Sequence, residues 1–107
     1  MIKKVYNKLV RDKIPDMIRK AGKTFSTHIA SEDEYEQSLW DKMDEEVAEF
    51  KDNPCEEEMA DILEVMEAIT IFYALDPYDV ETARQAKAGR RGSFKDRIIL
   101  EEVEEVE

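Results

Sequence analysis

The step from Asn53 to Pro54 most constrains the fold of this chain, because it separates two long segments that both have helical periodicity. Asn53 is a typical N-cap residue, proline is favoured in a first helical turn, and Glu56 completes a capping box. We therefore expect one helix from the Ser31 cap to about Asp52 and a second from Pro54 to about Leu75. So short a turn predicts an antiparallel helical hairpin.

Four acidic residues lie symmetrically about this turn. They form two pairs with the i, i+3 spacing that places side chains on one helix face, Glu46 with Glu49 and Glu58 with Asp61. An antiparallel hairpin would place Glu46 opposite Asp61 and Glu49 opposite Glu58. Because only eight residues separate Glu49 from Glu58, the helices must turn sharply.

The acidic pairs fall on the apolar sides of the two segments. Glu46 lies within a stripe of apolar residues formed by Leu39, Met43 and Phe50. On the second segment the expected inward stripe is Ile62, Met66, Ile69 and Tyr73. Glu58 lies about 40° from the centre of that stripe. Four inward carboxylates would repel one another without a cation, so we expect one divalent metal ion, or a pair of them, between the carboxylates. The alternative is that they are ordinary acids of a chain with 27 acidic residues, but two pairs in matched register argue against it.

The expected ligands are all oxygen atoms, which favours Mg²⁺ or Mn²⁺ over zinc or copper. The chain has one cysteine, Cys55, and one histidine, His28, so we expect neither a disulfide framework nor a zinc cluster. It has no Walker loop, Rossmann glycine pattern or nucleophile elbow, which disfavours kinase, dehydrogenase and esterase functions.

The charge distribution indicates a small anionic ligand. The net charge of −11 disfavours long nucleic acid, which binds to extended basic surfaces. Residues 1–23 nevertheless carry a net charge of +6 and residues 84–97 a net charge of +5. Basic segments together with an acidic metal site suit a phosphorylated ligand such as a nucleotide.

The length of the chain predicts a single domain over residues 1–107, with an apolar content of 42% that supports a modest core. The segment from Ala68 to Leu75 is apolar on nearly every side, so we expect an oligomer built by helix packing. No apolar run is long enough to span a membrane and no signal-peptide pattern is present, so we expect a soluble, cytoplasmic protein.

Shorter elements are expected on either side of the hairpin. We expect a helix over residues 12–21 and another from Pro77, capped by Asp76, to Ala88, where Gly89 would end it. Residues 2–6, 24–30 and 97–100 have the character of short extended strands, residues 90–94 that of a basic loop, and residues 101–107 form an acidic tail. The expected fold class is therefore all-α, with short extended segments near the termini.

The acidic pattern also resembles a known family. Glu45-Glu46-x-x-Glu49 followed by Glu58-x-x-Asp61 resembles the EExxE and ExxD motifs of the all-alpha NTP pyrophosphohydrolases, which include MazG-like proteins and phosphoribosyl-ATP pyrophosphohydrolase. The opening segment 6–15 (YNKLVRDKIP) and the late segment 87–94 (KAGRRGSF) resemble elements of small MazG-like members. The resemblance covers nearly the whole chain.

This resemblance implies a helical bundle that assembles as a homodimer or homotetramer and cleaves a nucleoside triphosphate between its α and β phosphates. Magnesium, or alternatively manganese, would be the cofactor, held by the catalytic acids Glu46, Glu49, Glu58 and Asp61. Glu45 would be a further catalytic acid, either supporting the metal ligands from behind or orienting water. The candidates to hold the phosphates are basic or amide side chains, namely Asn7, Lys8, Arg11, Lys87, Arg90 and Arg91. Noncanonical nucleotides would be natural substrates for such an enzyme in a house-cleaning role.

Two other functions remain open. The chain could keep the helical scaffold but act as a metal- and nucleotide-binding regulatory module, because acidic pairs can bind metal without supporting turnover. It could also be a phosphoribosyl-ATP pyrophosphohydrolase in histidine biosynthesis. Turnover of nucleotides distinguishes the first of these alternatives from an enzyme.

Overall fold

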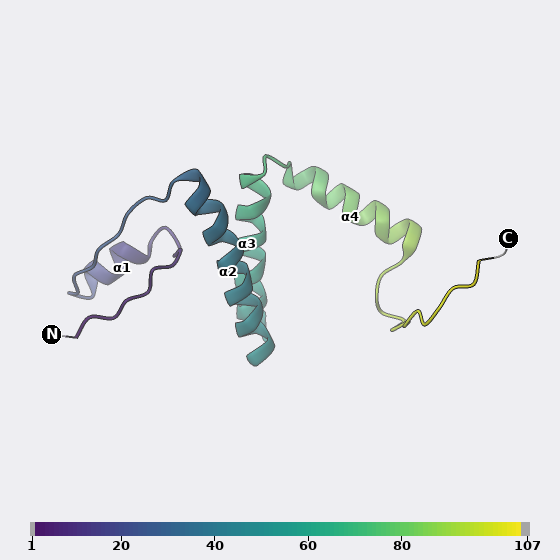
Figure 1. The fold of residues 1–107 in the computed structure, drawn as a ribbon, viewed down its shortest axis with the longest axis horizontal. Helices are drawn as coiled ribbons and strands as arrows, with labels where there is room; N and C mark the ends of the chain where they lie inside the picture. Colours follow the sequence, from purple (N-terminus) through teal and green to yellow (C-terminus); the bar gives the residue numbers. More distant parts are fainter. Residues whose placement is uncertain (1, 106–107) are drawn as a thin grey trace. The chain divides into compact units, whose positions relative to one another are not determined.

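The structure is a computed structural model that describes residues 2–105, and it is all-α (Figure 1). Its helices are α1 (Ile14–Lys20), α2 (Glu32–Asp52), α3 (Glu56–Phe72) and α4 (Pro77–Arg91). The contacts divide the chain into two compact units, with the boundary between Ala74 and Leu75. The expectation of one domain over residues 1–107 stays a prediction. Among residues 2–105, no helix has the length and apolarity needed to cross a bilayer.

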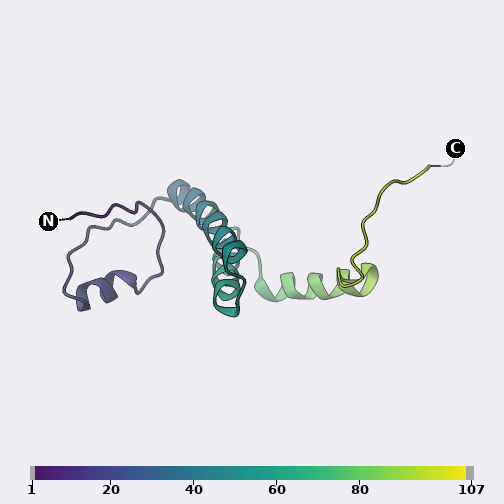
Figure 2. The ribbon, with the colours of Figure 1, turned by 90° about the horizontal axis from the view of Figure 1, so that it is seen from below.

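The first unit is built around an antiparallel hairpin of α2 and α3, which lie side by side in both ribbon views (Figures 1 and 2). Tyr35 near the start of α2 packs edge-to-face on Phe72 at the end of α3, with ring centroids 5.6 Å apart. The two residues are equally distant from the turn, so this contact confirms the register expected from the sequence. The same register places the acidic pairs opposite each other near the turn.

A second aromatic contact stabilises the end of the hairpin that lies away from the turn. The indole N–H of Trp40 donates a hydrogen bond to the hydroxyl of Tyr73 at 3.0 Å, and that hydroxyl donates to Glu36 at 2.8 Å. Tryptophan and tyrosine combine an apolar ring with one polar atom, and here each polar atom has a hydrogen-bond partner. These bonds join the first half of α2 to the residue that follows α3.

The start of α2 is as predicted, but the turn is not. Ser31 caps α2 by accepting a hydrogen bond from the N–H of Glu34, as the capping box requires. Asn53, however, ends α2 as its C-cap, and the N-cap of α3 is Cys55. The prediction that Asn53 caps the second helix is wrong: α3 begins only at Glu56, and the side-chain amide of Asn53 contacts Sγ of Cys55 at 3.8 Å instead of accepting a backbone N–H of α3. The first turn of α3 therefore begins with three glutamates, which suit a helix N-terminus.

The inward face of α3 also differs from the prediction. The buried apolar residues described by the structure are Leu39 on α2, with 2% of its surface exposed, and Val65 on α3, with 8% exposed. Met66, expected in the inward stripe, is 49% exposed. Because α3 is apolar on several sides, periodicity alone did not determine which side meets α2. The buried residue of α3 is Val65, one turn after Asp61, whose side chain remains 37% exposed.

Three other local predictions are corrected. Residues 2–6, 24–30 and 97–100 lie in no strand, since the described chain offers them no partner strand. The predicted helix over residues 12–21 is α1, which is shorter at both ends. Gly89 does not end the last helix: α4 continues to Arg91 and ends at Gly92, whose φ of 84° lies in the left-handed region that glycine favours. Residues 106 and 107 of the predicted acidic tail lie outside the described residues.

Candidate metal centre

Two turns of α2 and two turns of α3 bring four carboxylates together beside the hairpin turn. One oxygen atom from each of the four side chains lies within 4.8 Å of the others. The residues are those expected from the sequence: Glu46, Glu49, Glu58 and Asp61. We call this group the acidic cluster. Its donors are all carboxylate oxygens, which are the ligands that Mg²⁺ and Mn²⁺ prefer in proteins.

Glu46 is the most informative member of the acidic cluster. Only 5% of its surface is exposed, so the residue is held where an ionised carboxylate is costly without compensation. Its Oε2 atom and the Oε2 atom of Glu58 are buried and have no hydrogen-bond partner. Orphaned acceptors in a protein interior call for an explanation. Two of them, on facing helices, fit a cation with vacant coordination positions.

The electrostatics of the acidic cluster point the same way. Glu49 is exposed, yet its pKa is raised above the usual value for a glutamate, chiefly because the negative charge of Glu46 repels its ionised form. Glu45 and Glu58 add smaller repulsions. A carboxyl group whose pKa is raised by its neighbours marks a site with more negative charge than its local cations neutralise. A divalent cation would remove that repulsion.

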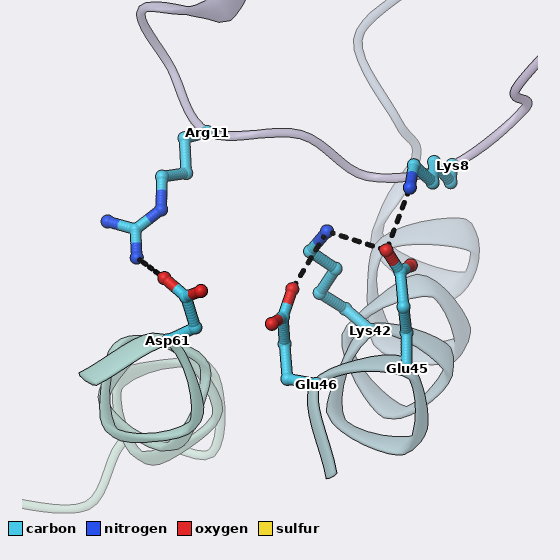
Figure 3. Close-up of polar contacts among 6 residues, drawn as sticks. All are labelled: Lys8, Arg11, Lys42, Glu45, Glu46 and Asp61. Atoms are coloured by element: carbon cyan, nitrogen blue, oxygen red, sulfur yellow. Dashed lines mark hydrogen bonds and ion pairs between the residues drawn. The ribbon is translucent and has the colours of Figure 1, made fainter. Parts of the chain in front are cut away.

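Cationic side chains pair with two members of the acidic cluster, Glu46 and Asp61 (Figure 3). Arg11 comes from the N-terminal segment, and its Nη2 atom lies 2.7 Å from Oδ1 of Asp61. Lys42 lies one turn before Glu46 on α2, with its Nζ atom 3.2 Å from Oε1 of that glutamate. Two of the four proposed ligands thus already form ion pairs. Lys42 is a residue that the sequence analysis missed, although its i, i+4 spacing from Glu46 was a usable signal.

Glu45 lies outside the acidic cluster and has a different environment. Its Oε1 atom accepts a hydrogen bond from Lys8 at 2.7 Å and lies 3.4 Å from Nζ of Lys42 (Figure 3). The hydrogen bond between Lys8 and Glu45 is the main reason that the pKa of Glu45 lies below its usual value. It is also the main reason that the pKa of Lys8 lies above its usual value. Glu45 therefore anchors two ammonium groups at the edge of the site. Its predicted role in orienting water stays a prediction.

A small pocket of about 50 Å³ opens beside these two lysines. It is lined by Asn7, Lys8, Leu9, Ser38, Asp41, Lys42 and Glu45. Asn7 has a φ of 44°, a left-handed conformation that asparagine tolerates better than most residues. It directly precedes the segment that carries Lys8 and Arg11. Three of the residues predicted to hold phosphates, Asn7, Lys8 and Arg11, thus lie at the edge of the site or in its adjoining pocket.

The remaining candidates lie elsewhere in the chain. Lys87, Arg90 and Arg91 are exposed residues of α4, in the second unit. Their predicted contact with phosphates stays a prediction. His28 contacts Glu34 near the start of α2, and Cys55 is the N-cap of α3, so neither belongs to the acidic cluster.

Comparison with known proteins does not assign a family. No family model matches the chain, and no solved structure matches it. An uncharacterized protein of Mycolicibacterium smegmatis is 51% identical over 43 residues, which are 40% of this chain and 44% of the relative. The chain thus matches less than half of the length of that relative.

Proposed function

We propose that this chain is a Mg²⁺-dependent nucleotide pyrophosphohydrolase of the all-alpha, MazG-like type. It would hydrolyse a nucleoside triphosphate between its α and β phosphates to release a nucleoside monophosphate and pyrophosphate. The observation that carries this proposal is the acidic cluster. Two facing helices bring four carboxylates together there, and a buried oxygen of Glu46 has no hydrogen-bond partner. The resemblance of the same residues to the EExxE and ExxD motifs supports it.

The acidic cluster would hold the metal through Glu46, Glu49, Glu58 and Asp61. When bound, Mg²⁺ supplies charge neutralisation at the phosphate oxygens and makes the phosphorus easier to attack. The chain supplies positive charge at the edge of the site, from Lys8, Lys42 and Arg11. Charged donors of this kind bind phosphate oxygens strongly and fix their orientation. In the reaction, water adds to the α phosphorus, the bond from that phosphorus to the bridging oxygen breaks, and pyrophosphate leaves.

The test is turnover by the purified protein. We expect pyrophosphate and the matching monophosphate to form from at least one member of a panel of ribo- and deoxyribonucleoside triphosphates in Mg²⁺. The double variant Glu46→Gln with Glu49→Gln should lose that activity. A matched control, Glu57→Gln with Glu67→Gln, removes the same charge from exposed positions of α3 and should keep it. If no triphosphate is hydrolysed, or if the Glu46 and Glu49 variant is fully active, the proposal fails. Metal-dependent nucleotide binding without turnover would favour a regulatory module instead.

We also propose that the chain works as a homodimer or homotetramer. A groove of about 300 Å³ on the hairpin is lined by Trp40, Met43, Met66, Ile69 and Thr70, from both long helices. Its lining is predominantly apolar, and exposed apolar grooves of this kind are typical of protein interfaces. Sedimentation equilibrium should show an oligomer that Met66→Lys dissociates. The neighbouring exposed change Glu67→Lys is the control and should leave the oligomer intact.

A further inference from the structure

Arg11 and Lys42 occupy an unusual position, because each pairs with a residue that the proposed metal would need. Arg11 lies 2.7 Å from Asp61, and Lys42 lies 3.2 Å from Glu46 (Figure 3). They approach from different elements, one from the N-terminal segment and the other from α2 itself. The acidic cluster is therefore partly neutralised by its own chain.

We propose that Arg11 and Lys42 are internal counter-ions, which a divalent metal displaces from the acidic cluster and which then bind the phosphate groups of a polyphosphate ligand. This inference rests on the metal site of the proposed function. In this order of binding, the metal binds first and the phosphate second. The phosphate contacts come from Arg11 and Lys42, which are paired with Asp61 and Glu46 before the metal binds.

The charge balance of the site supports this order. Before metal binds, four carboxylates of the acidic cluster face two cationic side chains, Arg11 and Lys42. A divalent ion delivers two positive charges to the same oxygen atoms. The site as a whole then becomes neutral, and the displaced Arg11 and Lys42 keep only their longer contacts at its edge, 3.9 Å to Glu64 and 3.4 Å to Glu45. Cationic groups freed from their carboxylates in this way attract an anionic ligand.

The surroundings of the two cations make the exchange physically accessible. The Arg11 side chain is 56% exposed, so its guanidinium group can turn away from Asp61 without leaving solvent. Lys42 is more buried, but Glu45 lies 3.4 Å from its ammonium group and offers a second partner. Glu45 also holds Lys8, beside the pocket that Lys8 and Lys42 share. A phosphate group at this edge could therefore meet three cationic side chains.

The inference predicts opposite effects on two affinities, which a purely structural role would not produce. In Arg11→Gln, Mn²⁺ no longer competes with the guanidinium group, so its affinity should rise about two- to five-fold, as expected for a largely exposed ion pair. The same variant should bind a diphosphonate about tenfold more weakly, because one charged hydrogen bond is lost. Lys42→Gln should likewise raise the affinity for Mn²⁺ and lower the affinity for the diphosphonate.

The experiment uses isothermal titration calorimetry on the full chain, with Mn²⁺ first and then methylenediphosphonate, a probe that cannot be hydrolysed. Wild-type protein should bind the diphosphonate when loaded with Mn²⁺ and not in the presence of EDTA. Lys51→Gln, a change at an exposed lysine of α2, removes the same charge and should alter neither affinity. Circular dichroism melting checks that each variant is folded.

The outcomes separate this inference from the proposed function. If wild-type protein binds no Mn²⁺, both fail. If it binds Mn²⁺ but both affinities fall together in Arg11→Gln and Lys42→Gln, or neither changes, the counter-ion inference is overturned and the metal site remains. Diphosphonate binding of equal strength with and without Mn²⁺ would also overturn the inference.

Discussion

The ion pair between Lys42 and Glu46 allows the electrostatics of the acidic cluster to be tested without a substrate. The side chain of Lys42 is 18% exposed and that of Glu46 is 7% exposed, so this is a largely buried pair. Removing one partner of a buried pair typically costs about 3 to 5 kcal/mol, because the other charge is left without compensation. We expect Lys42→Met to cost about 3 kcal/mol, the lower end of that range, since part of Lys42 remains in solvent.

A double-mutant cycle isolates the cause of this loss. Glu46→Gln alone removes a charge that repels Glu49 and leaves Lys42 beside Glu45, so it should cost less than about 1 kcal/mol in the absence of metal. Adding Glu46→Gln to Lys42→Met should recover about 2 kcal/mol, because no buried charge is then unpaired. Lys51→Met, at an exposed lysine of the same helix, should stay within about 0.5 kcal/mol of wild type.

Urea denaturation in EDTA, followed by circular dichroism, measures the stability of the wild type, the three variants of the cycle and Lys51→Met. The Lys42→Met loss corresponds to a fall in melting temperature of roughly 10 to 20 °C for a domain of this size. A cost below about 1 kcal/mol, or a double variant as unstable as the sum of its two single variants, would refute the buried-pair reasoning. Mn²⁺ should stabilise Lys42→Met more than wild type, since it replaces the missing positive charge.

Three further predictions follow from the same structure. At about one hundred times its dissociation constant, Mn²⁺ should stabilise the wild-type fold by about 2.7 kcal/mol. Scanning calorimetry after chelation should detect this as a rise in melting temperature, and an unchanged value would count against the site. In the metal-free protein, Glu46→Gln should lower the raised pKa of Glu49 toward its usual value, which carboxyl NMR titration can follow. Because that pKa is raised, the ionised form of Glu49 destabilises the fold at neutral pH, and this penalty disappears as the pH falls through the raised pKa. Ala74 has a φ of 57°, so Ala74→Gly should stabilise the protein by about 1 kcal/mol in urea denaturation; a loss of stability would show that the conformation is not strained.

The parts of the fold that could be predicted from the sequence are those set by local rules. Ser31 and Asp76 accept the capping bonds that their residue types favour, and both helices start where these caps place them. The convergence of the acidic pairs followed from helix periodicity and a short turn, which together fix the register of the hairpin. The identities of the clustered acids therefore follow from the sequence alone.

The parts that could not be predicted depend on tertiary contacts or on competition between local rules. α3 has more than one apolar side, and only its packing against α2 selects Val65 over Met66 as a buried residue. Gly89 and Gly92 both resemble helix stops, and the structure places the left-handed conformation at Gly92. The pairing of Arg11 with Asp61 joins residues 50 positions apart in the chain, a distance that no periodicity can bridge.

The bond from Trp40 to Tyr73 gives this protein a built-in optical reporter. Trp40 is the chain's single tryptophan, and its indole joins the middle of α2 to Tyr73, the residue that follows α3 at the end away from the hairpin turn. Its emission therefore reads the separation of the helix pair without any attached dye. A spectral change on adding Mn²⁺ would mean that an event near the turn is transmitted along the hairpin to its open end.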